Sequence, residues 1–125
     1  MDSPTPTTSL FRHDDNQVHF GPGETVFAEG DEGSTMFIVQ EGEVELKVGG
    51  VTVERVGPGG VIGEMGVVTG EPRSASAIAA SACTLASIDQ ARFQFMVQQT
   101  PFFAIDVMRV LAARLRRMNE TLSRS

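Results

Sequence analysis

A chain of 125 residues that is 41% hydrophobic is long enough for one globular domain and too apolar to be disordered throughout. Its longest uncharged apolar run falls far short of the roughly 18 residues of a membrane-spanning helix, and its single cysteine excludes an internal disulfide and an all-cysteine metal cluster. The net charge of −6 is the sum of −10 over residues 1–90 and +4 over residues 91–125, and such an acidic body disfavours nonspecific nucleic-acid binding.

The N-terminal segment "MDSPTPTTSL" lacks the basic region and apolar run of a signal peptide. We therefore expect a disordered or weakly ordered tail over residues 1–15, a single domain over residues 16–125 and a cytoplasmic location. The two histidines, His13 and His19, lie in or near the tail and cannot alone build a metal-centred active site. We interpret each as an ordinary surface or buried histidine.

From Val18 to Asp89, short β-type segments alternate with glycine turns about every ten residues. This spacing is typical of an antiparallel sandwich or barrel. The segment "VELKV" alternates apolar and charged residues, which predicts a half-buried strand, and "VGGV" after it suits a tight hairpin turn. The expected strands cover residues 17–20, 24–28, 35–40, 44–48, 51–56, 61–62, 74–80 and 83–89.

After Asp89, a plausible N-cap, the pattern changes to that of helices over about residues 90–100 and 102–122, separated by Pro101. The second helix carries a heptad seam that consists of Ala104, Met108, Leu111, Leu115, Met118 and Leu122. A second apolar stripe on its first half consists of Phe103, Val107 and Val110. We expect the first half to pack on the barrel and the second half to pair with a partner helix, the alternative being that the whole helix packs on its own barrel.

The segment "VIGEMGVVTGEPRSASA" (residues 61–77) places Glu64 and Arg73 nine residues apart among small residues. Gly63 permits a sharp turn into one helical turn, whose first amides favour an anion. Arg73 can hold a phosphate by two hydrogen bonds, and Glu64 can accept one from a sugar hydroxyl. Two interpretations stay open from these residues alone: a site for a phosphate beside a ribose hydroxyl, or a turn with a surface salt bridge worth at most about 1 kcal/mol.

This segment resembles the phosphate-binding cassette of the cyclic nucleotide-binding domain family, whose pattern is roughly Phe-Gly-Glu-apolar-Ala-apolar-apolar and then Pro-Arg-small-Ala. The matching residues are Ile62-Gly63-Glu64-Met65-Gly66-Val67-Val68 and Pro72-Arg73-Ser74-Ala75. Residues 29–46 resemble a second family signature of glycine turns and strands, and the resemblance covers about residues 18–122. Ile62 replaces the common Phe, and Gly66 replaces the usual Ala, which loosens the cassette helix by up to about 1 kcal/mol.

The resemblance implies a mainly β fold with C-terminal helices: an eight-stranded antiparallel, jelly-roll-like β-roll that holds the cassette, with the last helix as a lid. It implies that Glu64 binds the ribose 2′-hydroxyl and that Arg73, with Ser74 and nearby amides, binds the cyclic phosphate of cAMP or cGMP. No metal and no catalytic residue are expected. The expected nucleotide-binding residues are Gly63, Glu64, Met65, Gly66, Arg73, Ser74, Ala75, Val44, Val53, Ile62, Met118 and Asn119.

Two positions of the last helix bear on the base. Met118 can cover a base, and Asn119 offers both a donor and an acceptor, as the edge of adenine does. Ser74 offers the competing possibility of contact with the 2-amino group of a syn guanine. We therefore expect cAMP to be favoured over cGMP.

The resemblance implies a sensor that signals to a partner protein, or to a second copy as a homodimer, through the helix over residues 102–122. The catabolite-activator type of the family follows this helix with a DNA-binding domain. Since this sequence stops at Ser125, we expect no partner among nucleic acids, and none among membranes. The alternatives are a regulatory fragment of a larger transcription factor, channel or enzyme, and a scaffold without a ligand. An enzyme is disfavoured, because residues 21–125 contain no histidine for a cupin-like metal site.

Overall fold

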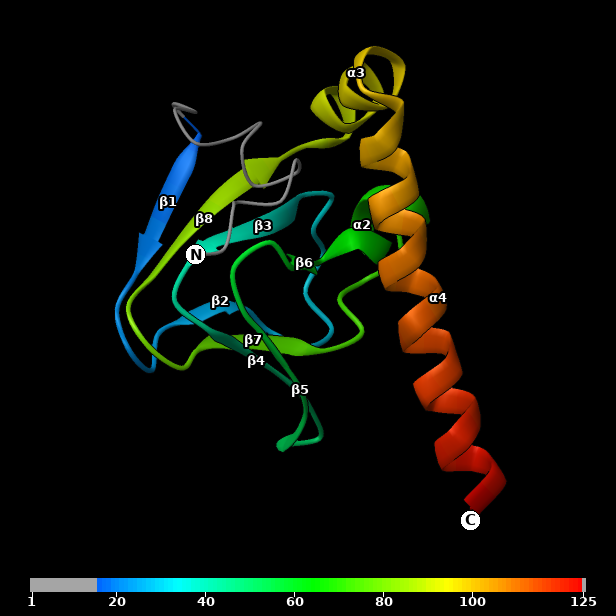
Figure 1. Ribbon diagram of the computed structural model, residues 1–125. Coiled ribbons are helices and arrows are strands. Elements are labelled where there is room, and N and C mark those ends of the chain that lie inside the picture. Colours follow the sequence, from blue (N-terminus) through cyan, green and yellow to red (C-terminus); the bar gives the residue numbers. More distant parts are fainter. Residues whose placement is uncertain (1–15, 125) are drawn as a thin grey trace, which may run out of the picture.

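The computed structural model describes the backbone of residues 16–124 and the side chains of residues 16–120, so the expected tail over residues 1–15 lies outside the described residues. Within this range eight antiparallel strands form two four-stranded sheets (Figure 1), in the orders β1-β8-β3-β6 and β2-β7-β4-β5. The strands are β1 (Gln17–Phe20), β2 (Thr25–Phe27), β3 (Met36–Glu41), β4 (Val44–Val48), β5 (Val51–Val56), β6 (Val61–Ile62), β7 (Ser76–Ala79) and β8 (Cys83–Ile88). The expected β-roll is confirmed.

Three helices complete the described fold: α2 (Glu64–Val68), α3 (Gln90–Gln99) and α4 (Pro101–Arg124). Asp89 caps α3, because its side chain accepts a hydrogen bond from the amide of Arg92 at 2.8 Å. Pro101 opens α4, a position at which the missing N–H of proline costs nothing. Helix α4 stands along one side of the roll and passes α2, while α3 lies at one end of the roll (Figure 1).

The seventh strand is shorter than the sequence predicts, since it begins at Ser76 rather than at residue 74. The backbone before it is already paired with a loop. The amide of Arg73 donates to the carbonyl of Asp31 at 2.8 Å, and the amide of Gly30 donates to the carbonyl of Arg73 at 2.8 Å. These two bonds fix Arg73 at the end of the roll beside α2.

Two apolar clusters form the core. One lies between the sheets and includes the fully buried Val44, Ile62 and Leu85. The other joins the β1-β8-β3-β6 sheet to the helices and includes Met36 and Phe103. Helices α2 and α4 are thereby held against the same end of the roll.

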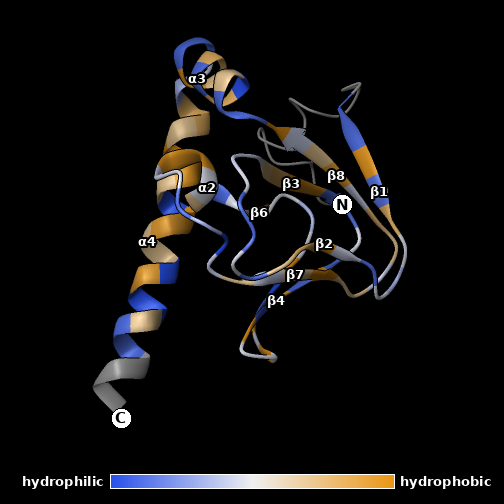
Figure 2. Cartoon of the chain, turned by 180° about the vertical axis from the view of Figure 1, so that it is seen from behind, coloured by the Kyte–Doolittle hydropathy of each residue, from blue (hydrophilic) through white to orange (hydrophobic). Residues whose placement is uncertain are grey.

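The apolar stripe on the first half of α4 faces this second cluster. Phe103 and Val107 are buried, and Val110 and Leu111 pack against the cluster in part. The seam residues Met108, Leu115 and Met118 are exposed, by 58–62% of their surface, and the side chain of Leu122 lies outside the described range. In Figure 2, hydrophobic colour dominates α4 beside α2 and α3, and hydrophilic residues become frequent toward its end.

Candidate functional site

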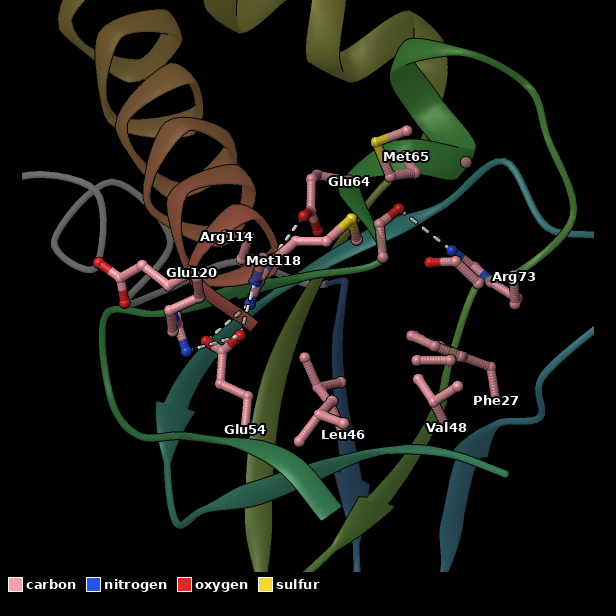
Figure 3. Close-up of a pocket in the computed structure, with 16 residues that line it drawn as sticks. Phe27, Leu46, Val48, Glu54, Glu64, Met65, Arg73, Arg114, Met118 and Glu120 are labelled. Atoms are coloured by element: carbon pink, nitrogen blue, oxygen red, sulfur yellow. Dashed lines mark hydrogen bonds and ion pairs between the residues drawn. The ribbon is translucent and has the colours of Figure 1, made fainter. Parts of the chain in front are cut away.

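A cavity of about 680 Å³ lies between the roll and α4, within the range typical of small-molecule sites. It is bounded by residues from β2, β4, β5, the α2 segment, the loop before β7, and α4 (Figure 3). Its lining consists of Phe27, Leu46, Val48, Val53, Glu54, Gly63, Glu64, Met65, Gly66, Arg73, Ser74, Ala75, Arg114, Arg117, Met118 and Glu120.

Arg73 is buried in the wall of this cavity, with 8% of its surface exposed. Its Nη1 donates to the carbonyl of Gly63 at 3.1 Å, and its Nη2 donates to the carbonyl of Thr35 at 2.7 Å. The guanidinium also lies 4.2 Å from the ring centroid of Phe27, a cation–π distance. Its Nε is buried and has no hydrogen-bond partner among the described residues. The side chain therefore keeps a buried donor beside the cavity.

Burial lowers the pKa of Arg73, and the negative charges of Asp31 and Glu64 oppose this effect only in part. Desolvation disfavours an unpaired cation. An anion placed against the guanidinium would remove this penalty and supply an acceptor for Nε. The environment of Arg73 therefore suits a phosphate.

Three glycines form the slot that holds the guanidinium. A Cβ atom at Gly33 would lie 2.6 Å from Nη2 of Arg73, and one at Gly63 would lie 2.7 Å from Nη1. Gly63 also has a φ of 74°, which favours glycine and confirms the expected sharp entry into α2. A Cβ atom at Gly66 would overlap the carbonyl oxygen of Gly33. Glycine stands here in place of the family's usual Ala because a methyl group would not fit against Gly33.

Glu64 is paired with an arginine other than Arg73. Nη1 of Arg114, on α4, donates to Oε1 of Glu64 at 2.5 Å. The same guanidinium donates through Nε to Oε1 of Glu54 at 2.9 Å and through Nη2 to Oε2 of Glu54 at 3.2 Å. Nη2 also donates to the carbonyl of Val61 at 2.7 Å. Arg114 thus joins two carboxylates and the strand before α2 (Figure 3).

Burial lowers the pKa of Arg114, but its hydrogen bond to Glu54 and the charges of Glu64 and Glu54 outweigh this effect and raise the pKa above its ordinary value. A second cation, Arg117, lies 3.4 Å from Oε1 of Glu54. In Figure 3, Arg73 lies at one end of the cavity, and Glu54 and Arg114 lie at the other. One end of the cavity therefore has the Arg73 cation with its unpartnered Nε. At the other end, the charges of two arginines and two glutamates balance.

The cavity brings together nine of the twelve predicted site residues: Gly63, Glu64, Met65, Gly66, Arg73, Ser74, Ala75, Val53 and Met118. The other three lie elsewhere. Val44 and Ile62 are fully buried in the core between the sheets, and Asn119 is exposed. Successive residues of a helix point about 100° apart, so Met118 facing the cavity turns Asn119 away from it.

Seven lining residues were not predicted from the sequence: Phe27, Leu46, Val48, Glu54, Arg114, Arg117 and Glu120. A local pattern could have found some of them. Arg114 lies four residues before Met118, on the same helix face, and Leu46 and Val48 share the alternation of β4. No local pattern of the sequence would have placed Glu54 in the cavity.

Within the described range, no group of three His, Cys, Asp or Glu side chains is placed to hold a metal ion. In the same range, no helix combines the length and the apolar character that crossing a membrane requires.

Comparisons with known proteins agree with this geometry. A family model described as "Cyclic nucleotide-binding domain" matches residues 17–100. The cAMP-dependent protein kinase regulatory subunit of Yarrowia lipolytica is 39% identical over 72 residues, which cover 58% of this chain and 19% of that protein. The CRP-like cAMP-activated global transcriptional regulator of Mycobacterium tuberculosis is 31% identical over 113 residues, which cover 85% of this chain and 50% of that protein.

Among solved structures, the catabolite activator protein of Thermus thermophilus matches with a TM-score of 0.77 and 28% identity. The match covers 86% of this chain and 53% of that chain. The chain thus spans half or less of the length of the two curated relatives.

Proposed function

This chain belongs to the cyclic nucleotide-binding domain family, and on that premise we propose that it binds a cyclic nucleoside monophosphate as a regulatory sensor. The observation that carries the proposal is the buried Arg73, which lines the cavity with an unpartnered Nε. A cyclic phosphate carries a single negative charge and supplies the acceptors that this guanidinium lacks. The charge-assisted hydrogen bonds of such a pair are about twice as strong as neutral ones.

The rest of the cavity supports the same ligand. Glu64 uses Oε1 for Arg114, and its second carboxylate oxygen can accept a hydrogen bond from a ribose 2′-hydroxyl. Leu46, Val48 and Met118 supply apolar surface for a base (Figure 3). The phosphate, the sugar and the base would each meet a group of matching chemistry.

For the base, we propose cAMP in preference to cGMP. Both curated relatives above are named for cAMP. Asn119 does not support this choice, because it is exposed and outside the cavity lining. Met118 can cover either purine, so the preference rests on the relatives.

We further propose that α4 carries the output. Its first half packs on the core, and its second half both lines the cavity, through Arg114 and Met118, and exposes Leu115. A ligand that contacts Met118 would change the free energy of the helix that presents the exposed seam to a second copy or to another protein. A cytoplasmic sensor without catalytic activity remains the function that we propose, in accord with relatives that are regulatory proteins.

Titration calorimetry with cAMP, cGMP and 5′-AMP tests the proposal directly. We expect saturable binding of both cyclic nucleotides, tighter binding of cAMP, and much weaker binding of 5′-AMP, whose additional charge and open phosphate do not fit one arginine in a narrow slot. Equal affinity for all three would indicate a general anion site. Absence of binding to either cyclic nucleotide would overturn the proposal.

A further inference from the structure

Glu54 is a second carboxylate in the wall of the cavity, and its position is set by an irregularity of the sheet. In the ladder of β4 and β5, Leu46 pairs with Glu54 but Lys47 pairs with Thr52, so that Val53 is an extra residue in β5. Such bulges re-aim side chains. Here both Val53 and Glu54 line the cavity, whereas regular alternation would send them to opposite faces.

We propose that Glu54 is a positioning residue, which holds Arg114 against Glu64 and thereby sets how strongly the site recognises a ribose 2′-hydroxyl. The inference deepens the proposed function and rests on it. No contact between Glu54 and the nucleotide is required.

The contacts of Arg114 carry the proposal. Glu54 binds Arg114 through both carboxylate oxygens, at 2.9 and 3.2 Å, and Glu64 binds it through one oxygen. The three side chains are largely shielded, with exposed fractions of 17% for Glu54, 19% for Arg114 and 6% for Glu64. Two-pronged contacts of this kind fix the plane of a guanidinium. Glu54 therefore sets the orientation from which Arg114 meets Glu64.

The loss of Glu54 would leave Nε of Arg114 without its acceptor in a shielded position. The guanidinium would keep only the single contact to Glu64 and the bond from Nη2 to the carbonyl of Val61. A cation released in this way is free to turn away from Glu64. Glu64 would then lose the partner that holds its second oxygen ready for the ribose.

Simple electrostatics predicts the opposite effect on affinity. Glu54 is a negative charge in the wall of a cavity that we assign to an anion, so its removal should by charge alone strengthen binding. A positioning role predicts weaker binding and weaker selection of the ribose. The sign of the change in cAMP affinity therefore separates an effect of charge alone from a positioning role of Glu54.

The experiment measures dissociation constants for cAMP and 2′-deoxy-cAMP with the wild type, Glu54→Gln, Glu54→Asp, Glu64→Gln and Glu45→Gln. Glu45→Gln is the matched control, because Glu45 forms an ion pair with Arg55 at 2.8 Å on the same hairpin outside the cavity. Glu64→Gln shows the size of the effect when the ribose acceptor itself is changed. Glu54→Asp keeps the charge but shortens the side chain, which prevents the same two-pronged contact.

We expect Glu54→Gln and Glu54→Asp each to weaken cAMP binding by about tenfold, and to reduce the preference for cAMP over its 2′-deoxy analogue by about threefold or more. Glu45→Gln should leave both quantities within about twofold of the wild type. If Glu54→Gln fails to fold, Glu54→Asp alone decides the matter.

A wild-type ribose preference in a folded Glu54 variant, at any affinity, would overturn the positioning role while the proposed function stands. Failure of the wild type to bind either nucleotide would instead overturn the proposed function. A merely structural role for Glu54 would lower affinity or stability without changing the preference between the two sugars.

Discussion

At the scale of residues, the position of Arg73 depends on the absence of a Cβ atom at three neighbouring glycines. The guanidinium fits because Gly33, Gly63 and Gly66 have no side chains, and it is held by the carbonyls of Gly63 and Thr35. The buried Nε is the one nitrogen of this guanidinium without a partner among the described residues. Arg73 therefore holds the wall of the cavity together and is also the residue to which we assign the phosphate.

Arg73→Ala should abolish nucleotide binding, at a cost of about 2–5 kcal/mol in affinity, because the phosphate loses its charged partner. It should also lower stability by roughly 1–3 kcal/mol, because the buried carbonyls of Gly63 and Thr35 lose their donor. Calorimetric titration and thermal unfolding measure the two effects separately.

Arg73→Lys provides the matched comparison for this position. An ammonium keeps the charge but cannot make the two-pronged contact, so binding should recover only in part. Binding by Arg73→Ala within threefold of the wild type would show that the phosphate does not lie at Arg73.

Gly66→Ala should destabilise the protein and weaken binding, although alanine favours helices by about 1 kcal/mol over glycine. The new methyl group would overlap the carbonyl oxygen of Gly33 and lie 3.0 Å from Nη1 of Arg73. Such overpacking costs about 1–3 kcal/mol, which corresponds to a fall of several degrees in the melting temperature. The measurement is a thermal melt with a parallel titration of cAMP.

Gly57→Ala is the control, since a Cβ atom at Gly57 would meet nothing within 4 Å and its φ is not in the left-handed region. It should be neutral or raise stability by a few tenths of a kcal/mol up to about 1 kcal/mol. A melting temperature for Gly66→Ala at or above that of the wild type would mean that the slot tolerates the family's usual residue.

At the scale of elements, the surroundings of α4 divide it into two halves, as the apolar stripe on its first half predicts. Phe103 and Val107 pack on the core, whereas Arg114 and Met118 contact the cavity. Met108 and Leu115 remain exposed. The first half of α4 is therefore fixed by the core, and the contacts of the second half depend on what occupies the cavity.

Hydrogen exchange of residues 112–120 should slow when cAMP binds, because the base supplies contacts to Met118 that the helix otherwise lacks. Exchange over residues 103–111 should change little, since these residues already pack on the core. The measurement is amide exchange followed by mass spectrometry, with and without cAMP. Strong protection of residues 112–120 without cAMP, and no change with it, would exclude this segment as the switch.

At the scale of the whole molecule, the cavity connects parts that are distant in the sequence. β2, the β4–β5 hairpin, the α2 segment and α4 all contribute to its wall. A ligand in this position would contact the β2-β7-β4-β5 sheet, the α2 segment and the last helix at once. Its binding should therefore stabilise the entire domain and not one element.

The melting temperature should rise with cAMP concentration. The gain in the free energy of unfolding should be about 2.7 kcal/mol at a ligand concentration 100 times the dissociation constant. Differential scanning fluorimetry gives the shift, with 5′-AMP at equal concentration as the control. Equal shifts for both compounds would contradict recognition of a cyclic phosphate.

From the residues alone, an antiparallel sandwich or barrel could be predicted, because glycine turns and strand alternation are local patterns. The β-roll and the cassette with Glu64 and Arg73 followed from the resemblance to the family, which the spacing of these two residues carries. The sequence also identified the apolar stripe of Phe103 and Val107, because helical periodicity is local. The twelve predicted site residues included nine that line the cavity. The three exceptions, Val44, Ile62 and Asn119, show that a position on an element does not determine which way its side chain faces.

The partners of the charged residues could not be predicted before the fold was known. Glu64 pairs with Arg114, fifty positions away in the sequence, and Glu54 joins them through a bulge that no alternation reveals. The packing reason for Gly66 likewise depends on the carbonyl of Gly33. Hydrogen bonds and steric contacts act over a few ångströms in space, so contacts between distant segments exist only once the sheets and α4 have packed together.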